Sequence, residues 1–326
     1  MRIAPFMGAI RFYRVPHIWI NSGEITLKEY ISLFKLFKDQ PTEQVFAHFY
    51  PAKRPGNVLD FDAPFKDIAK QSFDGYDSWA FQQERFRQKY NSSEVPKLRN
   101  YLNYTFVRLV TLEQESPGQY FQFAQKDEWI RFNTGLQNSF GADILAIFQR
   151  YKEKEGYSPD LRPRPDWVYK GFRTPTDKWC RDLFGGKAPE IAWYSKDSRD
   201  FVFDTSYQLD KEAFDHLFER AKERAGLPGA QDEVVRNYLR GAIENLVPKI
   251  TRNYKVAIPV YYVEERRMQL LLPFLPATGD PNNCSSFLVE RDDEQRCYRL
   301  KTIFDLDQAY FSARLITRPD KDWLNP

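Results

Sequence analysis

Three aspartates lie where an expected strand passes into another element, and they are the carboxylates best placed for chemistry. Asp305 and Asp307 stand one residue apart before the last expected helix, and Asp204 follows Phe203. Hard divalent cations prefer carboxylate oxygens, and a bound cation can activate water for hydrolysis. An aspartate at a helix start also accepts backbone N–H groups. We predict that Asp305 or Asp307 caps this helix, with a divalent-cation site as the alternative; Asp204 is either a turn residue or part of a polar site.

A second set of residues combines aromatic rings, amides and cations. Tyrosine rings can stack on unpaired bases, while guanidinium and ammonium groups hold phosphates. Both cations and tyrosines can instead snorkel at the edge of a core, and Asn133-Thr134-Gly135 can form a tight turn that ends a strand. The candidate ligand-binding residues are Tyr101, Tyr104, Arg108, Asn133, Thr134, Arg252, Tyr254, Lys255 and Arg314.

The tripeptide Arg-Asn-Tyr occurs at residues 99–101, 236–238 and 252–254. The first two copies fall in expected helices, and the third precedes an expected strand. Tyr and Arg are both frequent in this chain, so recurrence by chance is expected. The tripeptide by itself therefore predicts no internal duplication.

The composition is that of a folded globular protein. Of the 326 residues, 42% are hydrophobic and 29% are charged, which supports a core and excludes general disorder. The formal net charge is only +3, so a nucleic-acid site would need a local cluster of cations. Aromatic residues reach 16%, and this abundance favours either a large core or an aromatic binding surface.

Histidines and cysteines are few and far apart, which argues against a zinc site and a disulfide framework. No stretch approaches the ~18 apolar residues of a membrane span, and charged residues interrupt the first twenty positions. We therefore predict a cytoplasmic protein that does not associate with membranes. The residues concerned are His17, His48, His216, Cys180, Cys284 and Cys297.

Hydrophobic periodicity predicts helices and locally paired strands, so the expected fold is α+β with a mainly antiparallel sheet. Residues 156–189 are rich in proline, glycine and charge and are expected to form a long loop. The expected helices are 79–90, 96–110, 211–225, 232–246 and 308–316. The expected strands are 120–123, 129–132, 144–148, 201–203, 255–263, 268–275, 285–290 and 297–304.

Residues 1–60 are expected to form a separate N-terminal segment ahead of an α+β domain at 61–326. Leu27, Tyr30 and Phe34 recur at helical spacing in this segment, which predicts a small helical element there. The turn-rich stretch from 51 to 64 is a candidate linker.

Several motifs together resemble one bacterial family that is named only as a domain of unknown function. The resemblance covers about residues 65–326 with the motifs in the same order, and members of that family are associated with RNA-binding modules of the OST-HTH (LOTUS) and cold-shock types. It implies an RNA context but supplies no catalytic residues. The motifs are residues 98–109, 132–136, 203–205, 252–259, 269–273 and 313–320.

Three functions follow as hypotheses. The first is binding of single-stranded RNA or a nucleotide-containing ligand through the aromatic and cationic set. The second is a metal-dependent phosphodiesterase or nuclease in which Asp204, Asp305 and Asp307 hold a divalent cation. The third is a protein-interaction module with Tyr and Arg as anchors. The sequence leaves open whether the protein is an enzyme.

Overall fold

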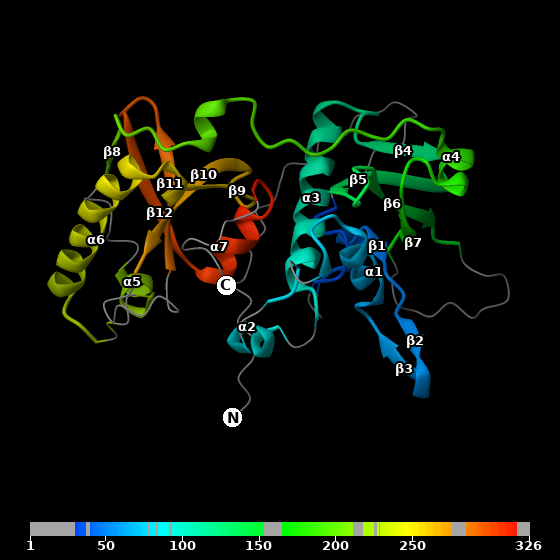
Figure 1. The fold of residues 1–326 in the computed structure, drawn as a ribbon, viewed down its shortest axis with the longest axis horizontal. Coiled ribbons are helices and arrows are strands. Elements are labelled where there is room, and N and C mark those ends of the chain that lie inside the picture. Colours follow the sequence, from blue (N-terminus) through cyan, green and yellow to red (C-terminus); the bar gives the residue numbers. More distant parts are fainter. Residues whose placement is uncertain are drawn as a thin grey trace. The chain divides into compact units, whose positions relative to one another are not determined.

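The computed structural model describes residues 30–36, 40–76, 79–81, 84–90, 93–152, 165–210, 218–224, 227, 229–275 and 285–317. The chain divides into two compact units, Met1–Trp193 and Tyr194–Pro326. Each unit contains helices and a five-stranded sheet (Figure 1). The predicted α+β class is therefore confirmed, and most strand pairs are antiparallel as expected.

In the first unit, β4 to β7 form an antiparallel meander, and β1 adds to its edge in parallel with β7. β2 and β3 form a separate two-stranded ribbon. The elements are η1 (Thr42–Gln44), β1 (Ala47–His48), β2 (Ala52–Arg54), η2 (Pro55–Asn57), β3 (Val58–Asp60), α1 (Ala63–Gln71), α2 (Glu84–Lys89), α3 (Pro96–Glu115), β4 (Phe121–Ala124), β5 (Trp129–Gln137), β6 (Asp143–Arg150), β7 (Trp167–Arg173) and α4 (Lys178–Phe184).

Aromatic side chains build the core between α3 and this sheet. Phe106 of α3 lies 4.7 Å from Phe46, 5.6 Å from Phe132 and 6.0 Å from Phe121, measured between ring centroids. All four rings are buried. Edge-to-face and tilted ring pairs at these distances are favourable beyond the area they bury. Packing therefore accounts for part of the high aromatic content.

In the second unit, β9 to β12 form an antiparallel meander, and β8 adds to its edge in parallel with β12. The elements are η4 (Ser198–Phe201), β8 (Gln208–Leu209), α5 (Phe218–Arg224), α6 (Asp232–Arg252), η6 (Tyr254–Val256), β9 (Ile258–Tyr262), β10 (Arg267–Phe274), β11 (Ser285–Asp292), β12 (Cys297–Asp305) and α7 (Leu306–Ala313).

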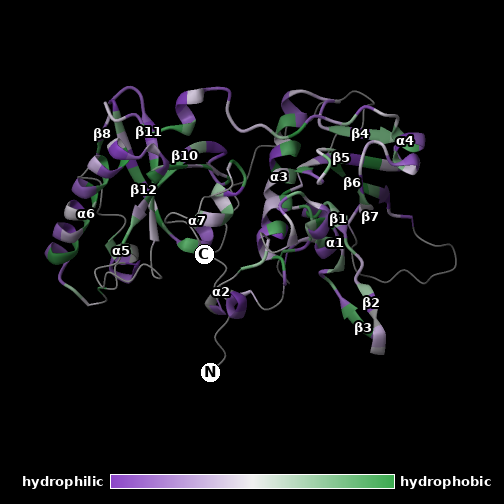
Figure 2. Ribbon diagram, viewed as in Figure 1, coloured by the Kyte–Doolittle hydropathy of each residue, from purple (hydrophilic) through white to green (hydrophobic). Residues whose placement is uncertain are grey.

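The helix α6 covers one face of the second sheet because its apolar residues recur every three or four positions. Val235, Leu239, Ile243 and Leu246 are buried and join one core with Leu272 of β10. Hydrophilic residues lie along the outer side of the same helix (Figure 2). This amphipathic pattern fixes the orientation of α6 on the sheet.

The two units repeat one arrangement of elements. In the described part of each unit, a 3-10 helix and a two-residue strand are followed by a short helix and a long helix, and then by a four-stranded meander and a further helix. In each, the first strand pairs in parallel with the last strand of the meander. The first unit additionally carries β2, β3 and α2.

Two of the three Arg-Asn-Tyr copies, at residues 99–101 and 236–238, lie near the start of the long helix of their unit, whereas the third, at 252–254, lies at the end of α6. Arg99 of α3 lies 5.0 Å from the ring of Phe65 in α1, and Arg236 of α6 lies 4.9 Å from the ring of Phe218 in α5. Each arginine thus stacks on a phenylalanine of the preceding short helix by a cation–π contact. Two of the three copies thus make equivalent contacts, and the statement that the tripeptide by itself shows no duplication stays a prediction.

The tyrosines of the two tripeptides also reach equivalent points, near the end of the second meander strand. The Tyr101 hydroxyl lies 2.7 Å from where a Cβ of Gly135 in β5 would stand. The Tyr238 hydroxyl donates a hydrogen bond to the carbonyl of Leu275, just after β10. We call this shared arrangement of elements the module, and each unit contains one.

The N-terminal segment differs from its predicted helix in the part that is described. Residues 30–36 form no helix, and Ser32 instead makes a parallel bridge with Val45. The helically spaced Tyr30 and Phe34 are buried from an irregular backbone. Leu27, the remaining residue of that pattern, lies outside the described residues.

The predicted boundary after residue 60 falls inside the first compact unit. β1 lies before that boundary, yet Ala47 pairs with Trp167 and His48 with Val168 of β7. The described part of the N-terminal segment therefore contributes an edge strand to the first sheet.

Two local expectations are wrong. The expected loop at 156–189 contains β7 and α4, because the apolar residues of β7 do not alternate with polar ones and lie among prolines and charges. The expected strand at 201–203 is absent, and the Phe203 ring instead stacks on Tyr298 at 4.1 Å. A side chain that packs from an irregular segment produces the same apolar signal as a short strand.

Candidate functional site

The most exposed of the predicted binding residues lie at the C-terminal end of α6. This helix continues to Arg252, past its predicted end at residue 246 and through Pro248. Lys249, Arg252, Tyr254 and Lys255 are all exposed there, and we call these four residues the α6-end patch. Tyr254 is 65% exposed, so its ring is open to solvent.

Hydrogen bonds hold the backbone of the patch in place. The Asn253 side chain accepts a hydrogen bond from the backbone N–H of Lys255 at 3.1 Å. The backbone N–H of Asn253 donates to the carbonyls of Lys249 and Ile250. The Arg252 guanidinium donates to the Pro248 carbonyl at 3.0 Å. The patch therefore sits on a fixed helix end and not on a free loop.

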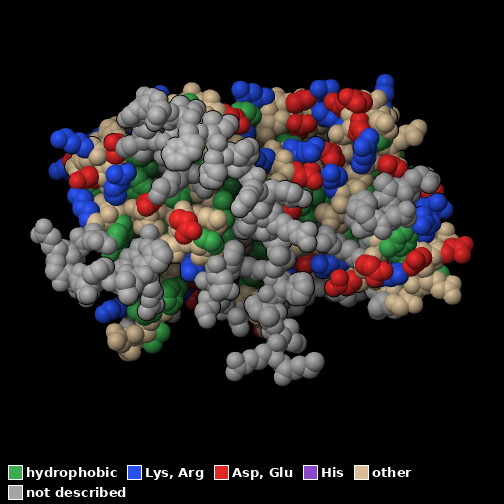
Figure 3. All heavy atoms as spheres, turned by 180° about the vertical axis from the view of Figure 1, so that it is seen from behind, with side chains coloured by type: hydrophobic (Ala, Val, Ile, Leu, Met, Phe, Trp, Pro, Cys, Tyr) green, Lys and Arg blue, Asp and Glu red, His purple; other side chains and the backbone are tan. Residues whose placement is uncertain are grey.

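The charged residues of the chain segment around the patch are all positive. Residues 245–263 contain three cations and no acidic residue. In the view of Figure 3, acidic and basic side chains intermingle over the described surface, in keeping with the small net charge. Local cations next to an exposed ring are the combination that holds phosphates and stacks on bases.

The predicted binding residues of the first unit are mostly buried. Tyr101 and Arg108 on α3 are 8% and 7% exposed, and Tyr104 is half-buried. The Arg108 Nε donates to the Trp193 carbonyl at 2.8 Å, and its guanidinium lies 5.0 Å from the Trp193 ring. These contacts anchor the end of the unit to α3.

Asn133 and Thr134 lie within β5, so the predicted tight turn is wrong. The sheet register shifts between Asn133 and Gln137, which accommodates the tripeptide as an irregularity of the strand. The Asn133 amide donates to Asp143 at 3.0 Å and accepts from the Gly135 backbone. The Thr134 hydroxyl donates to the Ile144 carbonyl at 2.6 Å. Both side chains are almost fully buried and serve the pairing of β5 with β6.

Asp305 caps α7, which confirms the prediction that Asp305 or Asp307 caps the last helix. Its carboxylate accepts the backbone N–H of Gln308 at 3.1 Å, and the Gln308 side chain completes a capping box. The same carboxylate pairs with Arg224 at 3.1 Å. Asp307 and Arg314 are buried, at 1% and 8% exposure.

Asp204 is exposed and organises a turn. Its carboxylate accepts hydrogen bonds from the Ser206 backbone at 2.9 Å and from the Ser206 hydroxyl at 2.7 Å. These hydrogen bonds lower the pKa of Asp204. Among the described residues, no three His, Cys, Asp or Glu side chains gather closely enough to hold a metal ion.

The structure thus brings together Arg252, Tyr254 and Lys255, which were predicted, and adds Lys249. The aspartates each take a structural role or a buried position. Tyr101 and Arg108 of the first unit are buried, because the face of α3 that carries them packs against the core of that unit.

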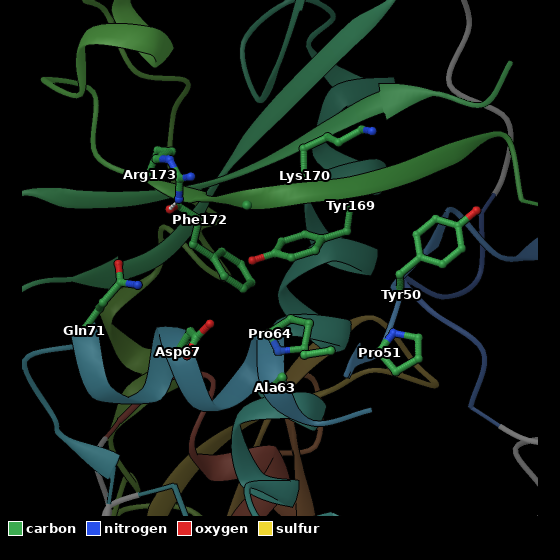
Figure 4. Close-up of a pocket in the computed structure, with 12 residues that line it drawn as sticks. Tyr50, Pro51, Ala63, Pro64, Asp67, Gln71, Tyr169, Lys170, Phe172 and Arg173 are labelled. Atoms are coloured by element: carbon green, nitrogen blue, oxygen red, sulfur yellow. Dashed lines mark hydrogen bonds between the residues drawn. The ribbon is translucent and has the colours of Figure 1, made fainter. Parts of the chain in front are cut away.

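A hollow of about 290 Å³ in the first unit was not predicted. It lies between α1, the end of β7 and the segment that follows β1 (Figure 4). Apolar atoms of Pro64 and Phe172 contribute to its wall, and Tyr50 stands at its side with its ring 51% exposed. The polar side chains that line it include Asp67, Gln71, Tyr169 and Arg173.

Tyr169 and Asp67 face one another across this hollow (Figure 4). Burial raises the pKa of Tyr169, and the charge of Asp67 raises it further, while Arg173 opposes the shift. Tyr169 therefore stays protonated, so its hydroxyl can donate a hydrogen bond. No sequence motif marks these residues, since the hollow joins α1 to a strand about a hundred residues later.

A family model for a domain of unknown function, DUF3825, matches residues 74–323. The chain belongs to the DUF3825 family. Searches of curated proteins and of solved structures found no match. The DUF3825 match covers both meanders, and it begins after β1 and α1 of the first unit. No helix of the described residues has the length and apolar character to cross a membrane.

Proposed function

We propose that this DUF3825 protein binds single-stranded RNA through the α6-end patch. One observation carries the proposal: a tyrosine ring that is 65% exposed stands among three exposed cations, in a stretch of chain without acidic residues. The resemblance to a bacterial family associated with OST-HTH and cold-shock modules supports an RNA context.

The chemistry of the patch suits unpaired nucleotides. A base can stack on the open face of Tyr254, and such a contact contributes about 1–3 kcal/mol. Lys249, Arg252 and Lys255 can hold the phosphates on either side of the stacked base. Every base has a π-face, so we expect weak sequence preference and strong dependence on salt.

Replacing Tyr254 by alanine should weaken RNA binding about tenfold, since one base–aromatic contact is lost. Tyr254→Phe should bind like the natural protein because the ring is retained. The measurement is fluorescence anisotropy of a labelled single-stranded RNA. Phe140→Ala is the matched control, because Phe140 is 92% exposed but belongs to the first unit.

The cations are tested through salt dependence. Lys249→Gln with Lys255→Gln should reduce the slope of log K against log salt by roughly 1.4, since each phosphate contact to a single strand contributes about 0.7. The control is Lys178→Gln with Arg181→Gln on α4, which removes the same charge elsewhere. Unchanged affinity in folded Tyr254→Ala together with an unchanged slope would disprove the proposal.

Protein interaction is the second candidate function, and the ribbon of β2 and β3 favours it. Val58, Leu59 and Phe61 are 60%, 49% and 61% exposed in or just after β3. Exposed apolar residues on adjacent positions are typical of a surface that is covered by a partner. RNA binding that is absent even at low salt would favour this function over the first.

A further inference from the structure

Asn253 lies between Arg252 and Tyr254, so the third copy of the Arg-Asn-Tyr tripeptide falls within the α6-end patch. Its side chain is exposed. Asn253 thus adds a neutral amide to the cations and the ring of the patch. An amide of fixed direction can distinguish one base from another, which cations that hold phosphates do not.

Hydrogen bonds fix the direction of the Asn253 amide. Its Oδ1 accepts the backbone N–H of Lys255 at 3.1 Å. The backbone N–H of Asn253 donates to the carbonyls of Lys249 at 3.0 Å and Ile250 at 3.1 Å. An asparagine amide has one oxygen and one nitrogen, so an oxygen that faces the Lys255 backbone turns Nδ2 away from it. The end of the amide that remains available is therefore the donor.

The first copy of the tripeptide uses the same group differently. In α3, the Asn100 Nδ2 donates to the Pro96 carbonyl, four residues earlier, at 3.0 Å. The equivalent carbonyl for Asn253 is that of Lys249, and the backbone N–H of Asn253 already donates to it. Among the residues that the structure describes, the Asn253 Nδ2 donates no hydrogen bond. A donor that the helix satisfies in the first copy is thus left available to a ligand in the third.

The side chains around this amide favour bases that present acceptors. Lysine and arginine donate hydrogen bonds and cannot accept them. Residues 245–263 contain no carboxylate. The O4 of uracil and the O6 of guanine accept hydrogen bonds, whereas cytosine and adenine carry an amino group at the same place. Bidentate reading of adenine needs both ends of an asparagine amide, and the Asn253 oxygen is engaged.

We propose that Asn253 makes the α6-end patch select keto bases, with uracil preferred to cytosine. A uracil that stacks on Tyr254 accepts a hydrogen bond from the Asn253 Nδ2 at its O4 carbonyl. Cytosine has a ring of the same size and stacks in the same way, but it places an amino group at that point. This inference rests on the proposed RNA binding and names the kind of nucleotide that the patch selects.

The test compares oligouridylate with oligocytidylate of about eight nucleotides, by fluorescence anisotropy on the full chain. The two labelled RNAs have equal length and charge, so their phosphate contacts are the same. One hydrogen bond to an exposed base corresponds to about threefold in affinity, so oligouridylate should bind about threefold more tightly. The preference is small because stacking and phosphate contacts, which do not distinguish the bases, supply most of the affinity.

Asn253→Asp keeps an oxygen for the Lys255 backbone N–H and replaces the free donor with a second acceptor. The preference should therefore reverse in favour of oligocytidylate, while both affinities fall because the patch gains a negative charge. The ratio is measured on one protein sample, so it does not depend on the fraction of folded protein.

Asn237→Asp is the matched control. Asn237 is the exposed asparagine of the second tripeptide copy and lies on the same helix. The variant makes the same change of charge away from the patch, so it should leave the ratio unchanged.

The outcomes separate this inference from the proposed function. If neither RNA binds even at low salt, RNA binding fails and the inference fails with it. If both RNAs bind the natural protein with equal affinity, RNA binding stands and the role of Asn253 is overturned. Tighter binding of oligocytidylate would also overturn it, because backbone carbonyls at the end of α6 would then be reading the amino group. An unchanged ratio in Asn253→Asp would show that another group selects the base.

Discussion

Replacing Arg131 by alanine should lower the free energy of unfolding by about 4 kcal/mol. Arg131 of β5 is fully buried, and no carboxylate pairs with it among the described residues. Its guanidinium donates to Gln122 at 2.8 Å, to the Cys180 sulfur at 3.0 Å and to the carbonyls of Gly185 and Lys187 at 3.2 and 2.6 Å. Alanine would leave a cavity and several buried acceptors without donors.

Arg131 lies in a buried environment in which its hydrogen-bond acceptors are uncharged. Burial lowers the pKa of Arg131 and raises the pKa of the Cys180 thiol, while the guanidinium opposes the second shift. The guanidinium also lies 4.7 Å from the Phe184 ring. One side chain thus ties the strand β5 to α4 and to the segment that follows it.

The measurement is urea denaturation followed by tryptophan fluorescence, since Trp129 begins the same strand. Arg131→Met should cost less than Arg131→Ala, because methionine fills much of the volume and only the hydrogen bonds are lost. Arg181→Ala on the exposed side of α4 is the control and should change stability by less than about 0.5 kcal/mol. A loss below about 1 kcal/mol in Arg131→Ala would contradict the expected role.

Gly135→Ala should lower the free energy of unfolding by about 3 kcal/mol, and two causes contribute to this loss. Gly135 has a φ of 75°, which strains any residue with a Cβ, and the new Cβ would stand 2.7 Å from the Tyr101 hydroxyl. Adding Tyr101→Phe removes the oxygen that clashes. In the Tyr101→Phe background, Gly135→Ala should therefore lower the free energy of unfolding by only about half as much as it does in the natural protein.

Gly141→Ala isolates the backbone contribution. Gly141 has nearly the same φ, 74°, and a Cβ there would meet nothing within 4 Å. It should lose only about 1 kcal/mol. Thermal unfolding of the three single variants and the double variant completes the cycle. Equal losses in Gly135→Ala and Gly141→Ala would show that the Tyr101 hydroxyl moves aside at no cost.

Local signals in the sequence predicted most of the meanders. The turn residues at 264–267 and 291–295 separate strands that pair as expected, and Asp305 is the N-cap residue of α7, as its position predicted. Pro96 likewise begins α3. In each case the residues that determine the element are adjacent in the chain, so their pattern is visible without knowledge of the fold.

The remaining features depend on partners far away in the chain. β1 and β8 have two residues each, too few for periodicity, and they are strands only because β7 and β12 offer a free edge. The hollow depends on Asp67 and Arg173 in the same way. For the site, the sequence indicated Arg252, Tyr254 and Lys255, but it could not show that the side of α3 with Tyr101 and Arg108 is buried.

The parallel pairing of a first strand with a last strand has a consequence for how the chain folds during synthesis. Ala47 leaves the ribosome long before its partner Trp167, whereas each hairpin of the meander joins neighbours. We expect the meander to form first and β1 to dock last, since distant contacts form slowly. Until then the edge of β7 is open to pairing with other chains. In the second unit, β8 likewise can pair only after β12 has been synthesised. In each unit, the docking of the first strand is therefore a late folding step, and the sheet edge can pair with other chains until that step is complete.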